Sequence, residues 1–129
     1  MIKHGILNPN VLSLLARVRH TNTIVIADRG FPYWPAIETV DISLVDDIPT
    51  VLDVLKAIKG WFNVGPAFMA EEFLRENPPA KQQAYADALA PVKIKFEPHP
   101  AFKIRVPGAV GLIRTGDTTQ YGNIILESA

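Results

Sequence analysis

Polar side chains that can do chemistry stand at the ends of predicted elements. His20 precedes the hydrophobic run TIVIA, Asp28 follows it, and His99 follows the run VKIKFE. Tyr121 and Asn123 belong to a third polar cluster, RTGDTTQYGN, which precedes the last hydrophobic run. An imidazole with an ordinary pKa of about 6.5 can give and take protons near neutral pH. The residue types and their places therefore predict a polar crevice with acid–base chemistry.

Each of these residues also has a purely structural interpretation. His20 at a helix end can interact with the helix dipole or with water, and Asp28 before an Arg-Gly pair can be a turn carboxylate. His99, between two prolines, fits an exposed loop, and Tyr121 and Asn123 fit the edge of a strand. Two histidines and an aspartate are also the ligand set of a metal facial triad, although no close His pair supports that interpretation. From the residues alone these alternatives stay open.

The composition excludes several functional classes. The chain has 129 residues, 13 basic and 13 acidic side chains and no cysteine. A zero formal charge does not favour binding to nucleic acid, and the lack of cysteine excludes disulfides, a thiolate nucleophile and Cys-based metal sites. The sequence has no P-loop, dinucleotide fingerprint, G-x-S-x-G motif, signal peptide or membrane span. We therefore expect a cytoplasmic protein without a cofactor.

Hydrophobic periodicity predicts three helices that position these residues. The polar stretch Asn8–Asn10 precedes a helix over 11–18. Ile48-Pro49 opens a second helix, which continues through Ile58 and ends at Gly60. A third helix is predicted over 80–90.

Short apolar runs predict the strands of a sheet. The run 23–28 is typical of a strand buried on both faces, and 38–45 alternates as a half-covered strand does. Pro66 argues against the strand over 65–70. The full set of predicted strands is 23–28, 38–45, 65–70, 92–97, 109–116 and 121–128. We therefore predict one α/β domain over 1–129, with a mostly parallel sheet flanked by helices and a C-terminal strand pair.

Two stretches of the chain resemble a known family. The segment KHGILNPNVLSLLARVRHTNTIVIADRGFP is similar to the opening of the D-ribose pyranase and L-fucose mutarotase family. The segment IRTGDTTQYGNIIL resembles that family's C-terminal signature. The resemblance covers both ends of the chain and, more loosely, the middle. It implies an isomerase that interconverts ring forms and anomers of a monosaccharide through the open-chain sugar, by general acid–base catalysis and without a metal or a cofactor.

The resemblance also implies roles for individual residues. It makes His20 the proton donor. It places the substrate against Asp28, His99, Tyr121, Gly122 and Asn123. His99 and Arg114 match the ribose-type branch of the family, whereas Tyr-Gly-Asn is common in the fucose type. The preferred sugar, and which of His20 and His99 is the main proton donor, stay open at this point.

The family resemblance further implies a ring-shaped homo-oligomer (a pentamer, octamer or decamer) with active sites at subunit boundaries. This chain departs from the family after Asp28, where Arg29 and the stretch FPYWP replace small residues. The aromatic residues of that stretch suit either a sugar ring or a subunit boundary. The alternative functions are a non-catalytic monosaccharide-binding or regulatory module, and an aldose–ketose isomerase, which usually needs a metal or a strong base.

Overall fold

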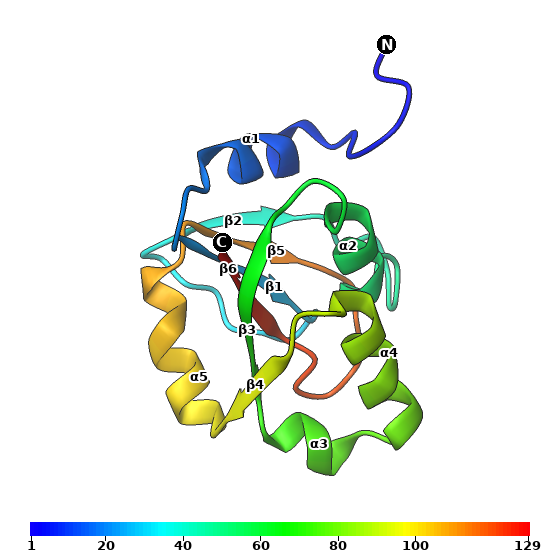
Figure 1. Ribbon diagram of the computed structural model, residues 1–129, viewed down its shortest axis with the longest axis vertical. Coiled ribbons are helices and arrows are strands. Elements are labelled where there is room, and N and C mark those ends of the chain that lie inside the picture. Colours follow the sequence, from blue (N-terminus) through cyan, green and yellow to red (C-terminus); the bar gives the residue numbers. More distant parts are fainter.

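Strand β1 (Thr23–Ala27) lies inside a six-stranded sheet in the computed structural model, which describes residues 1–129. The apolar, β-branched side chains of β1 point to both faces of the sheet, and all residues of the strand after Thr23 are buried. The strand order is β2-β5-β1-β6-β3-β4. The other strands are β2 (Glu38–Asp41), β3 (Val64–Ala70), β4 (Ile94–Glu97), β5 (Gly111–Arg114) and β6 (Ile124–Ser128). Figure 1 shows them crossing the centre of the molecule.

The sheet is mostly parallel, as predicted. β5 is parallel to both β1 and β2, and β3 is parallel to β4. β6 is antiparallel to β1 and to β3, between which it lies. The predicted C-terminal strands β5 and β6 are both present, and β1 separates them in the sheet. The parallel strands therefore end at one edge, where β6 begins; we call this the carboxyl edge.

Helices cover both faces of the sheet. α1 (Pro9–Arg17), α2 (Val51–Ile58) and α4 (Pro79–Leu89) pack on one face, where Ile24 and Ile26 of β1 join the larger core. α5 (His99–Arg105) packs on the other face with Val25 and Ala27. The short α3 (Glu72–Glu76) buries Phe73 in the larger core. None of these helices has the length and apolar character needed to cross a lipid bilayer.

The predicted helices begin where their capping residues place them. The Asn8 side chain accepts hydrogen bonds from the N–H groups of Asn10 and Val11, both at 3.0 Å, at the start of α1. At α2, Thr50 and Asp53 form a capping box. α2 ends at Ile58, just before Gly60, where the sequence predicts its end.

All six predicted strands are present, with ends that differ from the prediction by at most four residues, and the differences at β2 and β3 have local causes. β2 ends at Asp41 and not at residue 45, because the Asp41 carboxylate accepts bonds from the N–H and the hydroxyl of Ser43 and turns the chain. β3 forms in spite of Pro66, because its pairing with β6 is irregular between Val64 and Ala67.

The helices α3 and α5 were not predicted. α5 begins at His99 with Pro100 in its first turn, where a proline loses no helical hydrogen bond. Its only clear apolar signal is Phe102, followed one turn later by the buried Val106 just past its end. Such a pair is too short a pattern to distinguish a helix from a loop.

Candidate functional site

Asp28 and Asn123 meet at the carboxyl edge because of the strand register. Asp28 directly follows β1, and Asn123 directly precedes the antiparallel β6 beside it. The Asp28 N–H donates to the Asn123 side-chain oxygen at 2.7 Å. The Asn123 amide donates in return to Asp28 Oδ2 at 3.1 Å. The two residues form a reciprocal pair, with Asn123 only 4% exposed.

The Asp28 carboxylate also belongs to a local turn. Its Oδ1 accepts the Gly30 N–H at 2.9 Å, so the turn interpretation and the site interpretation both describe this residue. Burial raises the pKa of Asp28 above its ordinary value, and the neighbouring Asp117 adds to the rise. The hydrogen bonds from Gly30, Asn123 and Phe31 oppose it. Asp28 therefore takes up a proton at a higher pH than an ordinary aspartate does.

His99 and Glu72 meet because two parallel strands end in register. Ala70 of β3 pairs with Glu97 of β4, and each strand is followed two residues later by Glu72 or His99. Glu72 Oε2 accepts the His99 backbone N–H at 2.8 Å. The same oxygen lies 4.0 Å from His99 Nδ1.

The His99 ring is packed between aromatic neighbours. It stands edge-on to Tyr121, with ring centroids 5.1 Å apart, and its side chain is 22% exposed. Burial lowers the pKa of His99, as does Lys103, while the charges of Glu72 and Asp28 oppose this. The imidazole is therefore mostly neutral near neutral pH. The charge of Asp28 is felt at His99, which indicates that the two side chains lie on the same side of the molecule.

Tyr121 and Gly122 form a tight turn before β6. Tyr121 has φ of 54°, a left-handed conformation that is uncommon for a non-glycine residue. Gly122 donates its N–H to Thr119 O at 3.2 Å, and its carbonyl accepts the Tyr85 hydroxyl at 3.3 Å. A Cβ at Gly122 would lie 2.9 Å from the Tyr85 oxygen, so a side chain does not fit. Burial raises the pKa of Tyr85, which keeps its hydroxyl a neutral donor.

A buried polar bridge joins β5 to the site. Thr115 donates its hydroxyl to Ala27 O at 2.8 Å and accepts the Asp117 N–H at 3.1 Å. The Asp117 carboxylate accepts the N–H of Val51 at the start of α2 and the N–H of Thr119, both at 2.8 Å. Sequence reasoning saw only a polar turn here, because the partners of Thr115 and Asp117 come from distant parts of the chain.

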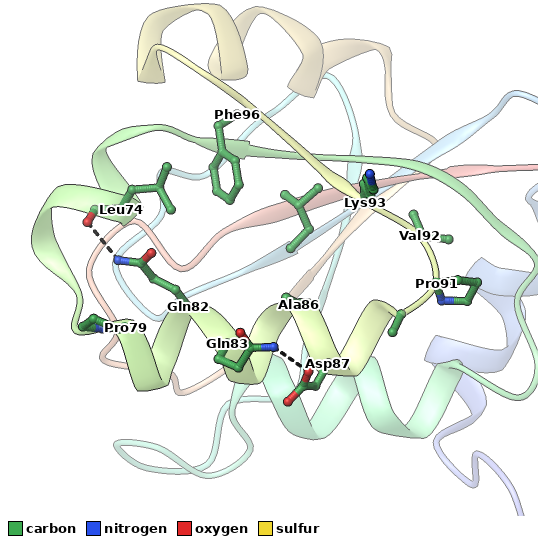
Figure 2. A pocket seen from close by; sticks show the side chains of 12 residues that line it. Leu74, Pro79, Gln82, Gln83, Ala86, Asp87, Pro91, Val92, Lys93 and Phe96 are labelled. Carbon is green, nitrogen blue, oxygen red and sulfur yellow. Dashed lines mark hydrogen bonds between the residues drawn. The ribbon is translucent and has the colours of Figure 1, made fainter.

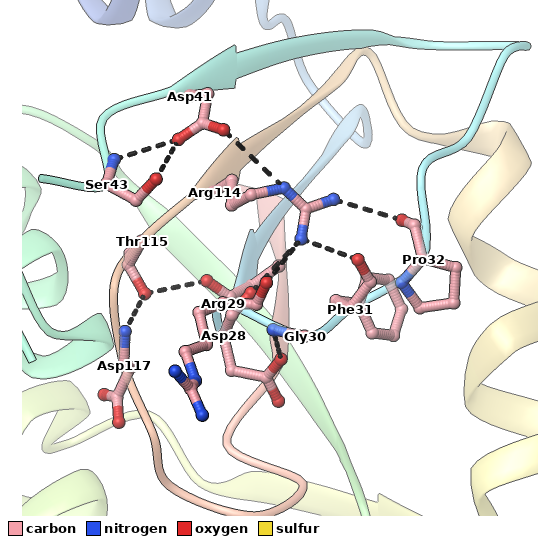
Figure 3. Close-up of polar contacts among 11 residues, drawn as sticks. Asp28, Arg29, Gly30, Phe31, Pro32, Asp41, Ser43, Arg114, Thr115 and Asp117 are labelled. Carbon is pink, nitrogen blue, oxygen red and sulfur yellow. Dashed lines mark hydrogen bonds and ion pairs between the residues drawn. The ribbon is translucent and has the colours of Figure 1, made fainter. Parts of the chain in front are cut away.

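Arg114 fastens the loop after β1 (Figure 3). Its guanidinium donates to the Phe31 carbonyl at 2.6 Å and to the Pro32 carbonyl at 3.3 Å. It also reaches the carbonyls of Asp28 and Arg29, both at 3.4 Å. Because Arg114 ends β5 and the loop carries Asp28, the guanidinium fixes the backbone from which the carboxylate projects.

The aromatic residues after Asp28 mostly pack within their own chain. Phe31 is buried against Phe102 of α5, with ring centroids 6.1 Å apart, and Trp34 lies beside Phe31. Tyr33 is 71% exposed. Phe31 and the partly buried Trp34 thus contribute to the smaller core, and Tyr33 is the most exposed of the three aromatic side chains.

A small polar pocket of about 190 Å³ opens beside Asp28. Its lining contains no hydrophobic side chain and consists of Asp28, Arg29, Gly30, Asp117, Thr118, Thr119 and Gln120. The largest cavity, of about 640 Å³, lies elsewhere, between α4 and β4 (Figure 2). There Gln82 donates to Leu74 O and Gln83 to Asp87, so these amide donors are already used within the chain. The predicted site residues do not line that larger cavity.

His20 lies at the opposite edge of the sheet. It is exposed at the tip of the turn before β1, next to Thr21, whose N–H donates to Ser128 O at the far end of β6. A five-residue strand such as β1 spans roughly 13–17 Å. Asp28 therefore cannot orient His20 of the same chain, and the three ligands of a facial triad do not meet within one chain.

The fold and the site together define a class of protein. It is a single α/β domain whose mixed sheet presents carboxylate, imidazole, amide and phenol groups at one edge. The chain belongs to the RbsD / FucU transport protein family, whose model matches residues 1–129. This match confirms the family resemblance found in the two terminal motifs.

Individual relatives agree with this assignment. The chain is 41% identical to D-ribose pyranase of Geobacillus kaustophilus over 99% of this chain and 93% of that protein. It is 39% identical to D-ribose pyranase of Chromobacterium violaceum over 99% and 97%. The structure of RbsD from Bacillus subtilis, in complex with D-ribose, superposes with a TM-score of 0.92 at 32% identity, covering 100% and 98% of the two chains.

A more distant structure shares the fold. Fucose mutarotase of Streptococcus pneumoniae, in complex with L-fucose, gives a TM-score of 0.84 at 20% identity and covers 99% of this chain and 98% of its own.

Proposed function

We propose that this protein is a monosaccharide mutarotase that interconverts the ring forms of D-ribose or a closely similar sugar. The observation that carries the proposal is the cluster of Asp28, His99, Tyr121 and Asn123 at the carboxyl edge. The cluster occurs in a chain about 40% identical to proteins named D-ribose pyranase. Ribose is preferred over fucose in this proposal because the pyranases match at twice the identity of the fucose mutarotase.

The reaction needs only proton transfers. Opening the ring removes a proton from the anomeric hydroxyl and breaks the bond between the anomeric carbon and the ring oxygen. The electron pair of that bond goes to the ring oxygen, which takes up a proton, and closure reverses both transfers. His20 gives its proton to the ring oxygen and takes up the proton of the anomeric hydroxyl, so the imidazole is unchanged once the ring is open, which suits a group that titrates near neutral pH. His99 and Asp28, with Tyr121 and Asn123, hold the other hydroxyls.

The proposal requires two copies of the chain. His20 and Asp28 lie at opposite ends of β1, so one chain cannot offer both to a single sugar. A site that joins His20 of one copy to the carboxyl edge of another resolves this separation. It also agrees with the predicted homo-oligomer, whose ring shape and subunit number stay predictions, as does the cytoplasmic location.

Exchange spectroscopy tests the proposal directly. With D-ribose and catalytic amounts of protein, we expect NMR saturation transfer to show faster exchange between pyranose and furanose forms. His20→Ala should lower this acceleration by about 10²–10⁴-fold, the usual contribution of a general acid or base. L-fucose serves as the comparison sugar.

The matched control is His4→Ala. His4 lies beside Trp61, outside the cluster, and its loss should leave the exchange rate unchanged. Ribose-dependent chemical-shift changes without any acceleration would contradict the proposal and favour a non-catalytic sugar-binding module. Conversion of ribose to a ketose would instead indicate an aldose–ketose isomerase.

A further inference from the structure

Glu72 stands behind the buried side of the His99 ring. Its Oε2 already accepts the His99 backbone N–H at 2.8 Å and lies 4.0 Å from Nδ1. Nδ1 is buried and has no hydrogen-bond partner, although the side chain as a whole is 22% exposed. A shift of about 1 Å brings the carboxylate and Nδ1 within hydrogen-bond distance, and such bonds are often long before a ligand is bound.

The two carboxylate oxygens of Glu72 have different partners. Oε1 lies 3.4 Å from the Arg75 guanidinium, one helical turn along α3, and Oε2 faces His99. The Glu72 side chain is 16% exposed. Arg75 therefore helps to hold the carboxylate in place, aimed at the ring.

We propose that Glu72 is a positioning residue that sets the tautomer of His99, holding the proton on Nδ1 and leaving Nε2 free to accept a hydrogen bond from the substrate. An ionised carboxylate only accepts hydrogen bonds, so it favours the tautomer with N–H on the nitrogen that it faces. A neutral imidazole then presents a bare nitrogen to the site, and a sugar hydroxyl is a suitable donor. The binding of a sugar hydroxyl by Nε2 rests on the proposed function, whereas the effect of Glu72 on the tautomer of His99 does not.

Several charged groups act on the same ring. Glu72 comes from α3, Lys103 from α5 and Asp28 from the end of β1, and the Tyr121 ring stands edge-on. The negative charges of Glu72 and Asp28 raise the pKa of His99, against the lowering by burial and Lys103. Removal of the Glu72 charge should therefore lower that pKa further.

Nitrogen NMR can observe the tautomer without any assay of activity. The chain has only three histidines, so the spectrum of the ¹⁵N-labelled full chain is simple, and His99→Gln assigns the ring of interest. In the unaltered protein we expect protonated Nδ1 and bare Nε2 at neutral pH. In Glu72→Gln we expect the Nε2–H form to gain population and the titration of His99 to move to lower pH.

The control variant is Glu71→Gln, which removes the same charge from the same segment. Glu71 pairs with Arg75 at 3.7 Å and does not contribute to the pKa of His99. Glutamine at position 72 retains an oxygen that can accept the backbone N–H, so the local fold should survive. Binding of D-ribose should weaken about threefold to tenfold in Glu72→Gln, the usual range for one hydrogen bond, and not in Glu71→Gln.

Two results would overturn the inference. One is a proton on Nε2 of His99 in the unaltered protein. The other is equal titration of His99 in the Glu72→Gln and Glu71→Gln proteins. The expected tautomer without any binding of ribose would support the role of Glu72 and count against the proposed substrate, so the two failures are distinguishable.

Discussion

Burial acts in opposite directions on the two titratable residues of the site. It raises the pKa of the Asp28 carboxyl and lowers the pKa of the His99 imidazole. The two pKa values therefore lie closer together than they do for free side chains. Both shifts favour the uncharged form, the protonated carboxyl of Asp28 and the neutral imidazole of His99. Neutral groups that still carry hydrogen-bonding capacity suit an uncharged, hydroxyl-rich ligand.

The lowered pKa of His99 predicts a pH-dependent stability. The pKa of the folded protein lies below the unfolded value of about 6.5, so the unfolded chain binds more protons between them. The contribution of His99 to the free energy of unfolding is therefore fully present above about pH 6.5, and it is lost as the pH falls through the pKa of His99 in the folded protein. We expect His99→Gln to weaken the decline in unfolding free energy below about pH 6.5, measured by urea denaturation at several pH values.

His4→Gln is the control for this experiment, because His4 is exposed and lies outside the site. It should leave the decline in place. An unchanged decline in His99→Gln would mean that other groups cause the acid sensitivity.

The individual site residues were predictable to different degrees. Asp28 and Asn123 could be named from the sequence because they carry family motifs, yet their hydrogen bonds required the β1–β6 register. Glu72 could not be predicted from the sequence, because it meets His99 only through the pairing of β3 with β4, which end side by side. Sequence pattern reports local spacing, whereas these contacts join residues far apart in the chain.

At the scale of elements, the loop after β1 depends on a single side chain of β5. Arg114 is 13% exposed on its side chain and donates to backbone carbonyls of four loop residues. We expect Arg114→Ala to lower the unfolding free energy by about 1–3 kcal/mol, because hydrogen bonds from a charged donor are lost and two of the carbonyls are part-buried. Amide hydrogen exchange should also become faster at Arg29 and Gly30.

Arg17→Ala provides the comparison, because Arg17 forms an ion pair with Glu38 in which both side chains are more than 40% exposed. Its loss should cost at most about 1 kcal/mol, as is usual for a surface ion pair. Equal effects of the two substitutions would show that Arg114 does not hold the loop.

Longer elements were predictable because their patterns repeat. α1 and α4 were predicted to within about two residues, and β1 was recognised from its β-branched run. α3 and α5 were missed because five and seven residues give too few repeats of the helical period. The order of the strands was also outside the reach of pattern analysis, because pairing partners are chosen by long-range packing.

At the scale of the whole molecule, the separation of His20 from Asp28 predicts complementation between subunits. His20→Ala and Asp28→Asn should each be nearly inactive alone. When the two variants are unfolded and refolded together, some sites combine an intact His20 with an intact Asp28. For a ring with random mixing, we expect about a quarter of the normal exchange activity.

The solution mass is the accompanying measurement. Light scattering should report a multiple of the mass of one chain. A monomer, or a refolded mixture as inactive as its components, would contradict a site shared between two copies.

The position of β5 and β6 in the sheet has a consequence for how the chain is made. β1 pairs only with β5 and β6, and β2 pairs only with β5. A ribosome therefore releases β1 and β2 long before any strand exists to receive them, and among the earlier strands only β3 and β4 can join. The nascent protein must carry an unpaired, strongly apolar strand through most of its synthesis, which exposes it to aggregation. Its folding becomes possible only when residues 111–128 emerge, and then the whole sheet can close in a single late step.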